Sequence, residues 1–292
     1  MQAMILAAGL GTRLLPYTTI RPKPLFPILN IPLLLAAVQR LQSCGFTHII
    51  VNCHHLGHQI ERELDGISGV ILQQEEVLLG TGGALGRARE HMLDEPLLVT
   101  NGDIYHTIDL AEFYRRHQQQ GAQVSLAVHD YPRFNTLLVD EGRVCRFKGN
   151  GIEGSLAVTG IHVLDPAIMD SIDPLAYSCI IDRYKDMLCC EKTIAAVRVD
   201  GCYWKDMGTV EDYLELHSNL LTKKVPCWAE MRGGPTPFLL AEDAVVRENL
   251  TLQDWCAVGR ATIGRNVCIS RSVVWDDAVI PDNSRIIDTI VF

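Results

Sequence analysis

The sequence predicts an α/β protein with a doubly wound, mainly parallel, Rossmann-like sheet and a short C-terminal left-handed parallel β-helix. Short apolar segments alternate with segments of helical periodicity from residue 4 to residue 130, which is typical of βαβ units. A glycine-rich loop follows the first apolar segment, where such sheets bind ligands. Near the C-terminus, apolar residues recur every six positions, as in stacked short strands.

Five short apolar segments bounded by turn residues are the predicted strands of the first half. The segments between them carry apolar residues on one helical face, as Leu34, Val38 and Leu41 do. Right-handed crossovers bring the carboxyl ends of parallel strands to one edge, so the loops that follow them should share a crevice. The predicted strands cover residues 4–8, 48–52, 70–73, 97–100 and 124–129, and the other helical faces are Leu56, Ile60 and Leu64, and Leu110, Phe113 and Tyr114.

The middle of the chain, residues 136–199, alternates less regularly. A following helix carries Val210, Leu214, His217 and Leu221 on one face, which predicts that His217 is a core residue and not a catalytic one. The strands predicted here cover residues 137–139, 144–147, 156–164 and 194–199, with a helix near 180–188.

The predicted domain boundaries follow a change in composition after residue 222. Residues 1–222 form the α/β domain, residues 223–256 a linker rich in glycine and proline, and residues 257–292 the β-helix. The repeat supplies only about two coils, which is short for an independently stable solenoid. We therefore expect it to dock on the first domain or on another subunit, so self-association is a further expectation.

Composition excludes several classes of protein. The 292 residues carry a net charge of −9, which argues against general affinity for nucleic acid or anionic membranes. No apolar run approaches the roughly 18 residues of a membrane helix. The ten cysteines are scattered without a C-x-x-C pair, which predicts reduced, buried thiols. Because no basic leader precedes the first strand, we expect a cytoplasmic protein.

The loop after the first predicted strand has the chemistry of a phosphate site. Gly9 and Gly11 let the backbone approach a ligand closely, and backbone N–H groups suit an anion with many oxygens. Arg13 offers a planar fork for phosphate oxygens, and Lys23 adds a point charge. The loop lacks the third glycine of G-x-G-x-x-G and is not a G-x-x-x-x-G-K-[ST] loop.

Five segments together resemble sugar-phosphate nucleotidyltransferases. They follow one another in the family's order across residues 1–220, and the trailing repeats resemble those of mannose-1-phosphate guanylyltransferases. The segments are Gly9-Leu10-Gly11-Thr12-Arg13-Leu14-Leu15-Pro16-Tyr17-Thr18 with Arg21-Pro22-Lys23-Pro24, Leu79-Gly80-Thr81-Gly82-Gly83-Ala84-Leu85, Asn101-Gly102-Asp103, Thr159-Gly160-Ile161-His162-Val163-Leu164, and Trp204-Lys205-Asp206-Met207-Gly208-Thr209.

The resemblance implies an enzyme that joins an NTP to a sugar 1-phosphate and releases pyrophosphate. It implies Mg²⁺ as cofactor, held by Asp103 and Asp206, and catalytic roles for Arg13, Lys23 and Asp103. The nucleotide-binding residues that it implies are Leu6, Ala8, Gly9, Gly11, Thr12, Arg13, Lys23, Glu75, Gly80 and Thr81, and the sugar-binding residues are Asn101, Gly102, Lys148, Thr159 and Gly160.

These roles agree with the chemistry of the residues. Carboxylates are the hard ligands that Mg²⁺ takes together with phosphates and water, and the two cations can neutralise a triphosphate. A sugar phosphate is already ionised at neutral pH, so the reaction needs no dedicated general base. Each residue alone also has a structural interpretation: residues 101–103 can form a turn, and Thr81 or Asp206 can cap a helix, although Thr209 is the better-placed cap.

Two departures from the family pattern affect the sugar pocket. Phe147-Lys148-Gly149 stands where the family commonly has Glu-Lys-Pro, and Phe134-Asn135-Thr136 where it often has an aromatic–glycine pair. His54 and His55 lack a third ligand at a recognisable spacing, and no motif supports a contact of His106, which lies near Asp103, with the metal environment or the sugar.

The same residues leave three functions to compare and exclude a fourth. Glu75, the second glycine segment and the repeats favour GTP with a mannose-1-phosphate-like sugar. Residues 1–220 also resemble a UTP-dependent uridylyltransferase acting on an amino-sugar 1-phosphate, N-acetylmuramic acid 1-phosphate. The third alternative is a catalytically silent regulatory subunit on the same fold. Such a subunit could lose its catalytic residues, so the presence of Arg13, Lys23, Asp103 and Asp206 argues against it. An acyltransferase of the hexapeptide type is rejected, because no histidine follows His217.

Overall fold

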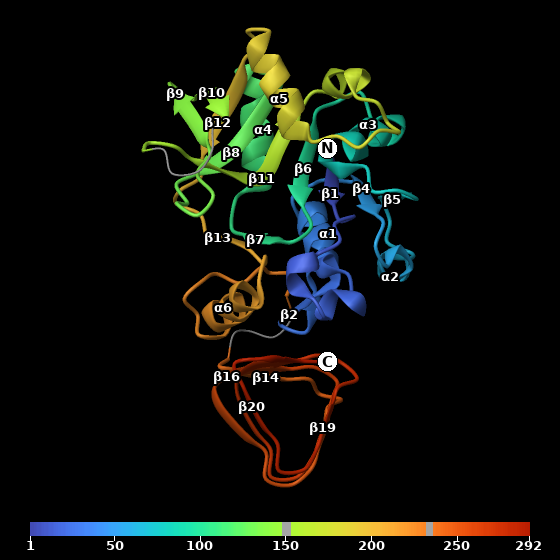
Figure 1. Ribbon diagram of the computed structural model, residues 1–292, viewed down its shortest axis with the longest axis vertical. Coiled ribbons are helices and arrows are strands. Elements are labelled where there is room, and N and C mark those ends of the chain that lie inside the picture. Colours follow the sequence, from blue (N-terminus) through green and yellow to red (C-terminus); the bar gives the residue numbers. More distant parts are fainter. Residues whose placement is uncertain (148–152, 232–235) are drawn as a thin grey trace. The chain divides into compact units, whose positions relative to one another are not determined.

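A computed structural model describes residues 1–147, 153–231 and 236–292, and these fall into two compact units (Figure 1). Unit 1 comprises residues 1–10 and 41–204, and unit 2 comprises residues 11–40 and 205–292. The chain thus leaves unit 1 directly after the first strand and its glycine, and returns within the first long helix. The boundary between the units therefore falls within the glycine-rich loop: Gly9 belongs to unit 1 and Gly11 to unit 2.

Unit 1 is built on a nine-stranded mixed sheet. Its strand order is β5-β4-β1-β6-β11-β8-β12-β10-β9. The neighbours β5, β4, β1 and β6 are parallel, as predicted, and so are β8 and β12. In contrast, β11 runs antiparallel between β6 and β8, and β10 is antiparallel to both of its neighbours. The strands are β1 (Gln2–Leu6), β4 (His48–Cys53), β5 (Val70–Gln74), β6 (Leu97–Asn101), β8 (Val124–His129), β9 (Leu137–Asp140), β10 (Arg143–Phe147), β11 (Ala157–Leu164) and β12 (Ile194–Arg198).

All the predicted helices are present, and a further helix, α3, begins in the second glycine segment. Asp109 caps α4 by accepting a hydrogen bond from the Glu112 N–H at 2.9 Å, and Thr209 caps α6 in the same way from the Asp212 N–H at 3.2 Å. The helices are α1 (Leu33–Ser43), α2 (Gly57–Leu64), α3 (Gly80–Ala88), α4 (Leu110–Gln120), α5 (Ile180–Cys189) and α6 (Val210–Leu221). The short elements are η1 (Thr12–Leu14), η2 (Tyr17–Thr19), η3 (Lys23–Leu25), β2 (Pro27–Ile28), β3 (Ile31–Pro32), η4 (Arg89–His91), β7 (Ile104–His106), η5 (Pro166–Ser171) and β13 (Trp204–Asp206).

The core of unit 1 lies between the sheet and the pair α3 and α5. Met4, Ile50 and Val99 from the parallel strands pack with Leu85 of α3 and Tyr184 of α5, and all five are fully buried. Because burial of large apolar side chains drives folding, this layer fixes α3 against the sheet. It thereby also fixes the loop that enters α3.

The C-terminal part of unit 2 consists of parallel strands arranged in two sheets. Side-chain pairs recur 17 residues apart, as in Asn249–Asn266 and Asn266–Asn283, so the strands stack in register (Figure 1). The arrangement is compatible with a β-helix. Its strands are β14 (Phe238–Leu240), β15 (Val245–Val246), β16 (Thr251–Val258), β17 (Thr262–Ile263), β18 (Cys268–Val274), β19 (Val279–Ile280), β20 (Arg285–Ile287) and β21 (Ile290–Val291). The strands β14 and β15 and the beginning of β16 lie within the stretch 223–256 that the composition predicts as a linker.

These strands dock on α6 and on the segment 11–40 within unit 2. Phe26 and Tyr17 meet the Trp275 ring edge to face, with centroids 4.7 and 6.0 Å away. His217 is fully buried there, and its Nε2 accepts a hydrogen bond from the Leu29 N–H at 3.3 Å. The prediction that His217 is a core residue is confirmed. No helix among the described residues is long and apolar enough to cross a membrane.

Candidate active site

The glycine-rich loop takes a conformation that requires glycine at position 11. Gly11 has φ +63°, and a Cβ there would lie 2.8 Å from Thr18 Cγ2. Its carbonyl accepts hydrogen bonds from the Leu14 N–H at 2.9 Å and from Thr18 Oγ1 at 3.2 Å. The turn places Thr12 and Arg13 in a short 3₁₀ helix, η1. In unit 1, Gly9 has open space around it, so a ligand can approach its backbone.

Two predicted cations meet one predicted carboxylate within unit 2. Lys23 Nζ lies 3.4 Å from Asp206 Oδ1, and Arg13 Nη2 lies 3.7 Å from Asp206 Oδ2. The Lys23 side chain is only 7% exposed, whereas that of Arg13 is 59% exposed. The buried lysine is therefore a fixed charge, and the arginine is free to turn toward an incoming anion.

The residues that flank Asp206 hold it in place. Lys205 Nζ forms ion pairs with Asp212 at 2.9 Å and Glu215 at 2.7 Å, which ties β13 to α6. A Cβ on Gly208 would lie 2.6 Å from Arg13 Nη1 and 2.7 Å from Asp206 Oδ2. Only glycine leaves room for the Arg13–Asp206 contact. No sequence pattern indicated the pairing of Lys205, because its partners lie on the next helix.

In unit 1, a buried polar chain connects β1 to the second glycine segment. Asn52 Oδ1 accepts a hydrogen bond from the Ala7 N–H at 2.8 Å, and its Nδ2 donates to Glu75 Oε1 at 2.8 Å. The other oxygen of Glu75 accepts from the Leu79 N–H at 3.2 Å. With 2% exposure, Glu75 anchors the entry to α3, where Gly80 has φ +68°. No role for Asn52 was predicted from the sequence. A polar residue at the end of an otherwise apolar strand could have indicated one.

The predicted sugar-side residues also come together in unit 1. Gly102 N–H donates to the Leu6 carbonyl at 2.9 Å, which places the turn after β6 beside the end of β1. Gly160 has φ +77°, and a Cβ there would lie 2.5 Å from Asn101 Nδ2. Thr159 is fully buried, and its hydroxyl donates to the Ala127 carbonyl at 2.9 Å. Its side chain therefore connects β11 to β8 within the sheet. Asp103 follows in the same turn and is half-buried.

An aromatic cluster lies next to these sugar-side residues. The rings of His129, Tyr131 and Phe134 stack in sequence with centroids 5.3 and 5.6 Å apart, and all three meet the ring of Trp204 edge to face. The indole N–H of Trp204 donates to the Thr159 carbonyl at 2.8 Å. Burial lowers the pKa of His129, which favours a neutral ring.

Asn135 braces the loop that carries this cluster. Its Oδ1 accepts from the Tyr131 N–H at 2.8 Å, and its Nδ2 donates to Asp130 Oδ1 at 2.7 Å. This is the position where the sequence departs from the aromatic–glycine pair. Lys148, at the other departure, lies outside the described residues.

The histidines that the sequence set aside take structural roles. His54 Nδ1 makes a hydrogen bond with the Glu75 carbonyl at 2.9 Å, and His106 Nδ1 accepts from the Ile108 N–H at 3.2 Å. Over residues 1–147, 153–231 and 236–292, no group of three or more His, Cys, Asp or Glu side chains could hold a metal ion by itself. A metal here would therefore need further ligands from substrate and water.

Comparison with known proteins decides the family. The family model described as "Nucleotidyl transferase" matches residues 2–223. The chain belongs to this nucleotidyl transferase family. The predicted resemblance to sugar-phosphate nucleotidyltransferases is thereby confirmed, and the protein is an enzyme of this class.

Relatives and solved structures agree with this assignment. Mannose-1-phosphate guanylyltransferase 1 of Arabidopsis thaliana is 30% identical over 94% of this chain and 79% of its own length. The mannose-1-phosphate guanylyltransferase of Mycobacterium tuberculosis is 29% identical over 97% of this chain and 80% of its own length. The crystal structure of HddC from Yersinia pseudotuberculosis superposes with a TM-score of 0.65 at 25% identity, covering 75% of this chain and 98% of that one.

Proposed function

We propose that this nucleotidyltransferase joins GTP to a mannose-1-phosphate-like sugar 1-phosphate and releases pyrophosphate. The observation that carries the proposal is the convergence of Arg13 and Lys23 on Asp206, directly after a glycine loop that can admit phosphates. Support for the base and the sugar comes from relatives that are named mannose-1-phosphate guanylyltransferases and align with more than nine-tenths of this chain.

The residues suit an in-line attack between two anions. An oxygen of the sugar phosphate attacks the α-phosphorus of the triphosphate, and the bond to the pyrophosphate oxygen breaks. Arg13 and Lys23 neutralise the triphosphate and the charge that develops on the leaving pyrophosphate. Because the Lys23 side chain is buried and held in place, its ammonium group needs little reorganisation during the reaction.

We propose Asp103 and Asp206 as ligands of Mg²⁺. The Asp206 carboxylate is 15% exposed and lies between two cations, and a hard oxygen donor of this kind fits an ion that takes its remaining ligands from phosphates and water. Bound Mg²⁺ would supply a positive charge to the phosphate oxygens. Arg13 and Lys23 lie 3.7 and 3.4 Å from Asp206, so their positive charges stand beside the proposed metal ligand, where they can also attract the phosphates of a nucleotide.

We further propose that Glu75, Gly80 and Thr81 form the base and ribose side of the site, with Leu6, Ala8, Gly9, Gly11 and Thr12 on the phosphate side. Asn101, Gly102 and Gly160 line the sugar side, Thr159 supports them through the sheet, and Lys148 contacts the sugar phosphate. The hydrogen bonds of Asn52 with Ala7 and Glu75 support this assignment, because they couple the end of β1 to the glycine segment.

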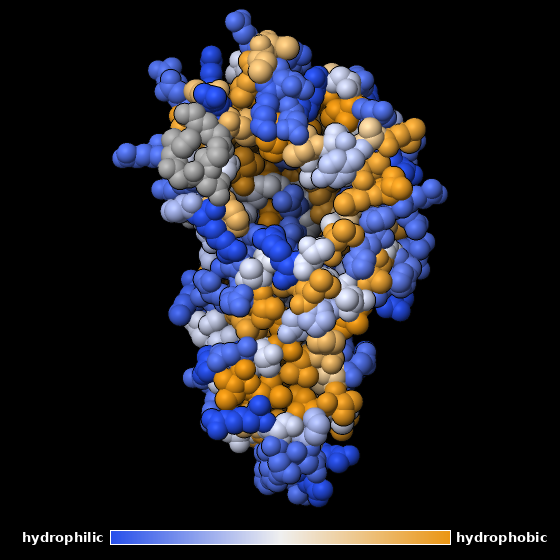
Figure 2. All heavy atoms as spheres, in the orientation of Figure 1, coloured by the Kyte–Doolittle hydropathy of each residue, from blue (hydrophilic) through white to orange (hydrophobic). Residues whose placement is uncertain are grey.

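The C-terminal strands are proposed to form a short left-handed parallel β-helix that mediates self-association. Hydrophobic surface gathers over this part of the molecule on the face that Figure 2 shows. Val245 on β15 and Val279 on β19 are 57% and 70% exposed, although both belong to stacked strands. A second copy that covers these edges would remove apolar surface and unpaired strand edges from water.

A substrate panel tests the proposed reaction. Purified protein with Mg²⁺ is combined with each of four NTPs and with mannose, glucose and N-acetylmuramic acid 1-phosphates, and pyrophosphate is measured. We expect release only when both substrates are present, fastest with GTP and mannose 1-phosphate. Loss of activity in Asp103→Ala with an unchanged melting temperature supports the metal assignment. Absence of pyrophosphate across the whole panel overturns the proposal.

A further inference from the structure

A second segment of unit 1 holds the glycine segment 79–82 from one side. The Ser178 N–H donates to the Leu79 carbonyl at 3.0 Å, and the Gly82 N–H donates to the Ser178 carbonyl at 2.9 Å. The Ile180 N–H donates to Thr81 Oγ1 at 3.0 Å. These three bonds fix the backbone directly after Tyr177, at Ser178 and Ile180. They hold Tyr177 beside the glycine segment.

Glycine at position 80 lets this segment come close. A Cβ on Gly80 would lie 2.5 Å from the Ser178 carbonyl oxygen and 3.0 Å from Cε2 of Tyr177. With φ +68°, the residue is also in a conformation that favours glycine. The edge of the Tyr177 ring thus lies against the bare backbone of Gly80.

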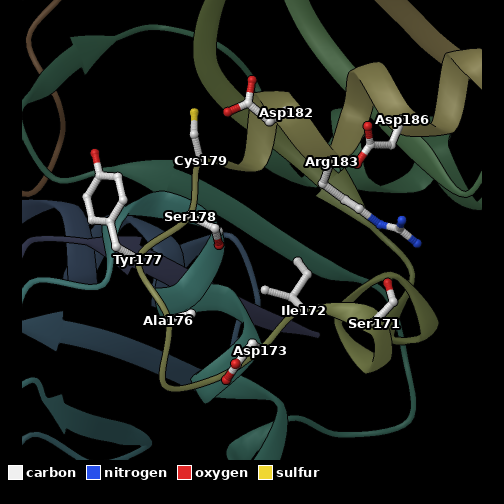
Figure 3. A pocket seen from close by; sticks show the side chains of 11 residues that line it. Ser171, Ile172, Asp173, Ala176, Tyr177, Ser178, Cys179, Asp182, Arg183 and Asp186 are labelled. Carbon is white, nitrogen blue, oxygen red and sulfur yellow. The ribbon is translucent and has the colours of Figure 1, made fainter.

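The Tyr177 ring is exposed although its backbone is fixed. It is 71% exposed and, among the described residues, makes no hydrogen bond and no ring–ring contact. Tyr177 belongs to the lining of a cavity of about 400 Å³ beside α3 and α5. Figure 3 shows its ring at one end of this lining, directed away from Arg183 and Asp186. A large exposed aromatic surface held beside the glycine segment is suited to pack against a flat apolar ligand.

We propose that Tyr177 packs against the nucleobase of the bound NTP and favours a purine over a pyrimidine. The inference rests on the proposed function, in which Gly80 and Thr81 lie on the base side of the site. A Cβ on Gly80 would lie 3.0 Å from Cε2 of Tyr177, so a base bound beside Gly80 lies within reach of the Tyr177 ring. A purine covers more of that ring than a pyrimidine does, so the benefit is greater for GTP than for UTP.

The test measures nucleotide preference in Tyr177→Ala and Tyr177→Trp. We expect Tyr177→Ala to raise KM for GTP about tenfold, the size of one aromatic–base contact, with kcat changed less than about twofold. The GTP-to-UTP preference should fall, and Tyr177→Trp should restore it. Leu175→Ala is the matched control, since Leu175 is 80% exposed in the same segment and should leave both constants unchanged.

Ribose 5′-triphosphate, which lacks a base, separates a base contact from a structural effect. Its inhibition constant should be the same for the wild type and Tyr177→Ala. An equal loss of affinity for GTP and for this analogue overturns the proposal, as does an unchanged KM for GTP. Should Tyr177→Ala fail to fold, Tyr177→Leu provides the same comparison without the ring. A wild-type protein inactive with every NTP refutes the proposed function itself, whereas an active wild type with an unaffected variant refutes only the role of Tyr177.

Discussion

The indole N–H of Trp275 donates a hydrogen bond to the hydroxyl of Tyr213 at 3.1 Å in the interior of unit 2. Tyr213 in turn donates to the Pro27 carbonyl. A side chain of the C-terminal strands is thus connected through α6 to the segment that carries Arg13 and Lys23. The Arg21 guanidinium also lies 4.9 Å from the centroid of the Trp275 ring.

Removing this aromatic contact should destabilise unit 2. Trp275 is 1% exposed, so Trp275→Ala leaves a large cavity and is expected to lower the free energy of unfolding by about 3–5 kcal/mol. Trp275→Phe keeps most of the apolar contact and loses the hydrogen bond, which should cost about 1 kcal/mol beyond its smaller volume. Guanidinium denaturation measures both, with the surface substitution Phe238→Ala as control. Equal stability of Trp275→Ala and the control would contradict the role given to this contact.

Gly208→Ala should impair catalysis without unfolding the protein. The added methyl group would meet Arg13 and Asp206, so the ion pair has to shift. A displacement of this size in a reacting site is expected to lower kcat about 100-fold. Gly201→Ala is the control, because a Cβ at Gly201 meets nothing within 4 Å. Pyrophosphate release and melting temperature are compared for the two variants, and a fully active Gly208→Ala would refute the prediction.

Gly160→Ala should affect the sugar side selectively. Its Cβ would displace the Asn101 amide, so KM for the sugar 1-phosphate should rise on the order of tenfold while KM for the NTP stays constant. Gly121→Ala is a matched control, because Gly121 also has positive φ and open space around it. Both variants should lose about 1–2 kcal/mol of stability from backbone strain alone. If both KM values change in parallel, the selective role is wrong.

Stability should decrease as pH falls from about 7 to about 5. Burial lowers the pKa of His217 to about 4 and that of His162 to about 3, from 6.5. The unfolded chain therefore binds protons that the folded chain does not below pH 6.5, and the free energy of unfolding falls by up to about 1.4 kcal/mol per pH unit for each histidine. Carboxylates with lowered pKa, such as Asp288, titrate below this window.

A substitution isolates the contribution of His217. His217→Gln removes one titrating group, so its melting temperature should decrease less steeply between about pH 7 and 5 than that of the wild type. His58→Gln serves as control, because His58 is exposed. Parallel curves for the wild type and His217→Gln would show that His217 does not titrate as its burial requires.

Much of the candidate site was predictable from local sequence. The strand before the glycine loop, the cap at Thr209 and the core position of His217 all follow from short-range patterns, and these agree with the structure. The five ordered motifs identified the family. The bonds of Asn52 were not predictable, because its partners Ala7 and Glu75 are brought to it by contacts across the fold. The ion pairs of Lys205 depend on how the chain turns between β13 and α6.

The sequence by itself determined the alternation of strands and helices in the first half of the chain, the family and the chemistry of the residues offered to phosphate. These depend on side-chain periodicity and on residue types within a few positions of one another. The tertiary structure decided that β11 runs antiparallel beside β6, that residues 11–40 belong with the C-terminal strands, and that Tyr177 lies against Gly80. Such pairings depend on which distant surfaces bury one another, and no short stretch of sequence carries that information.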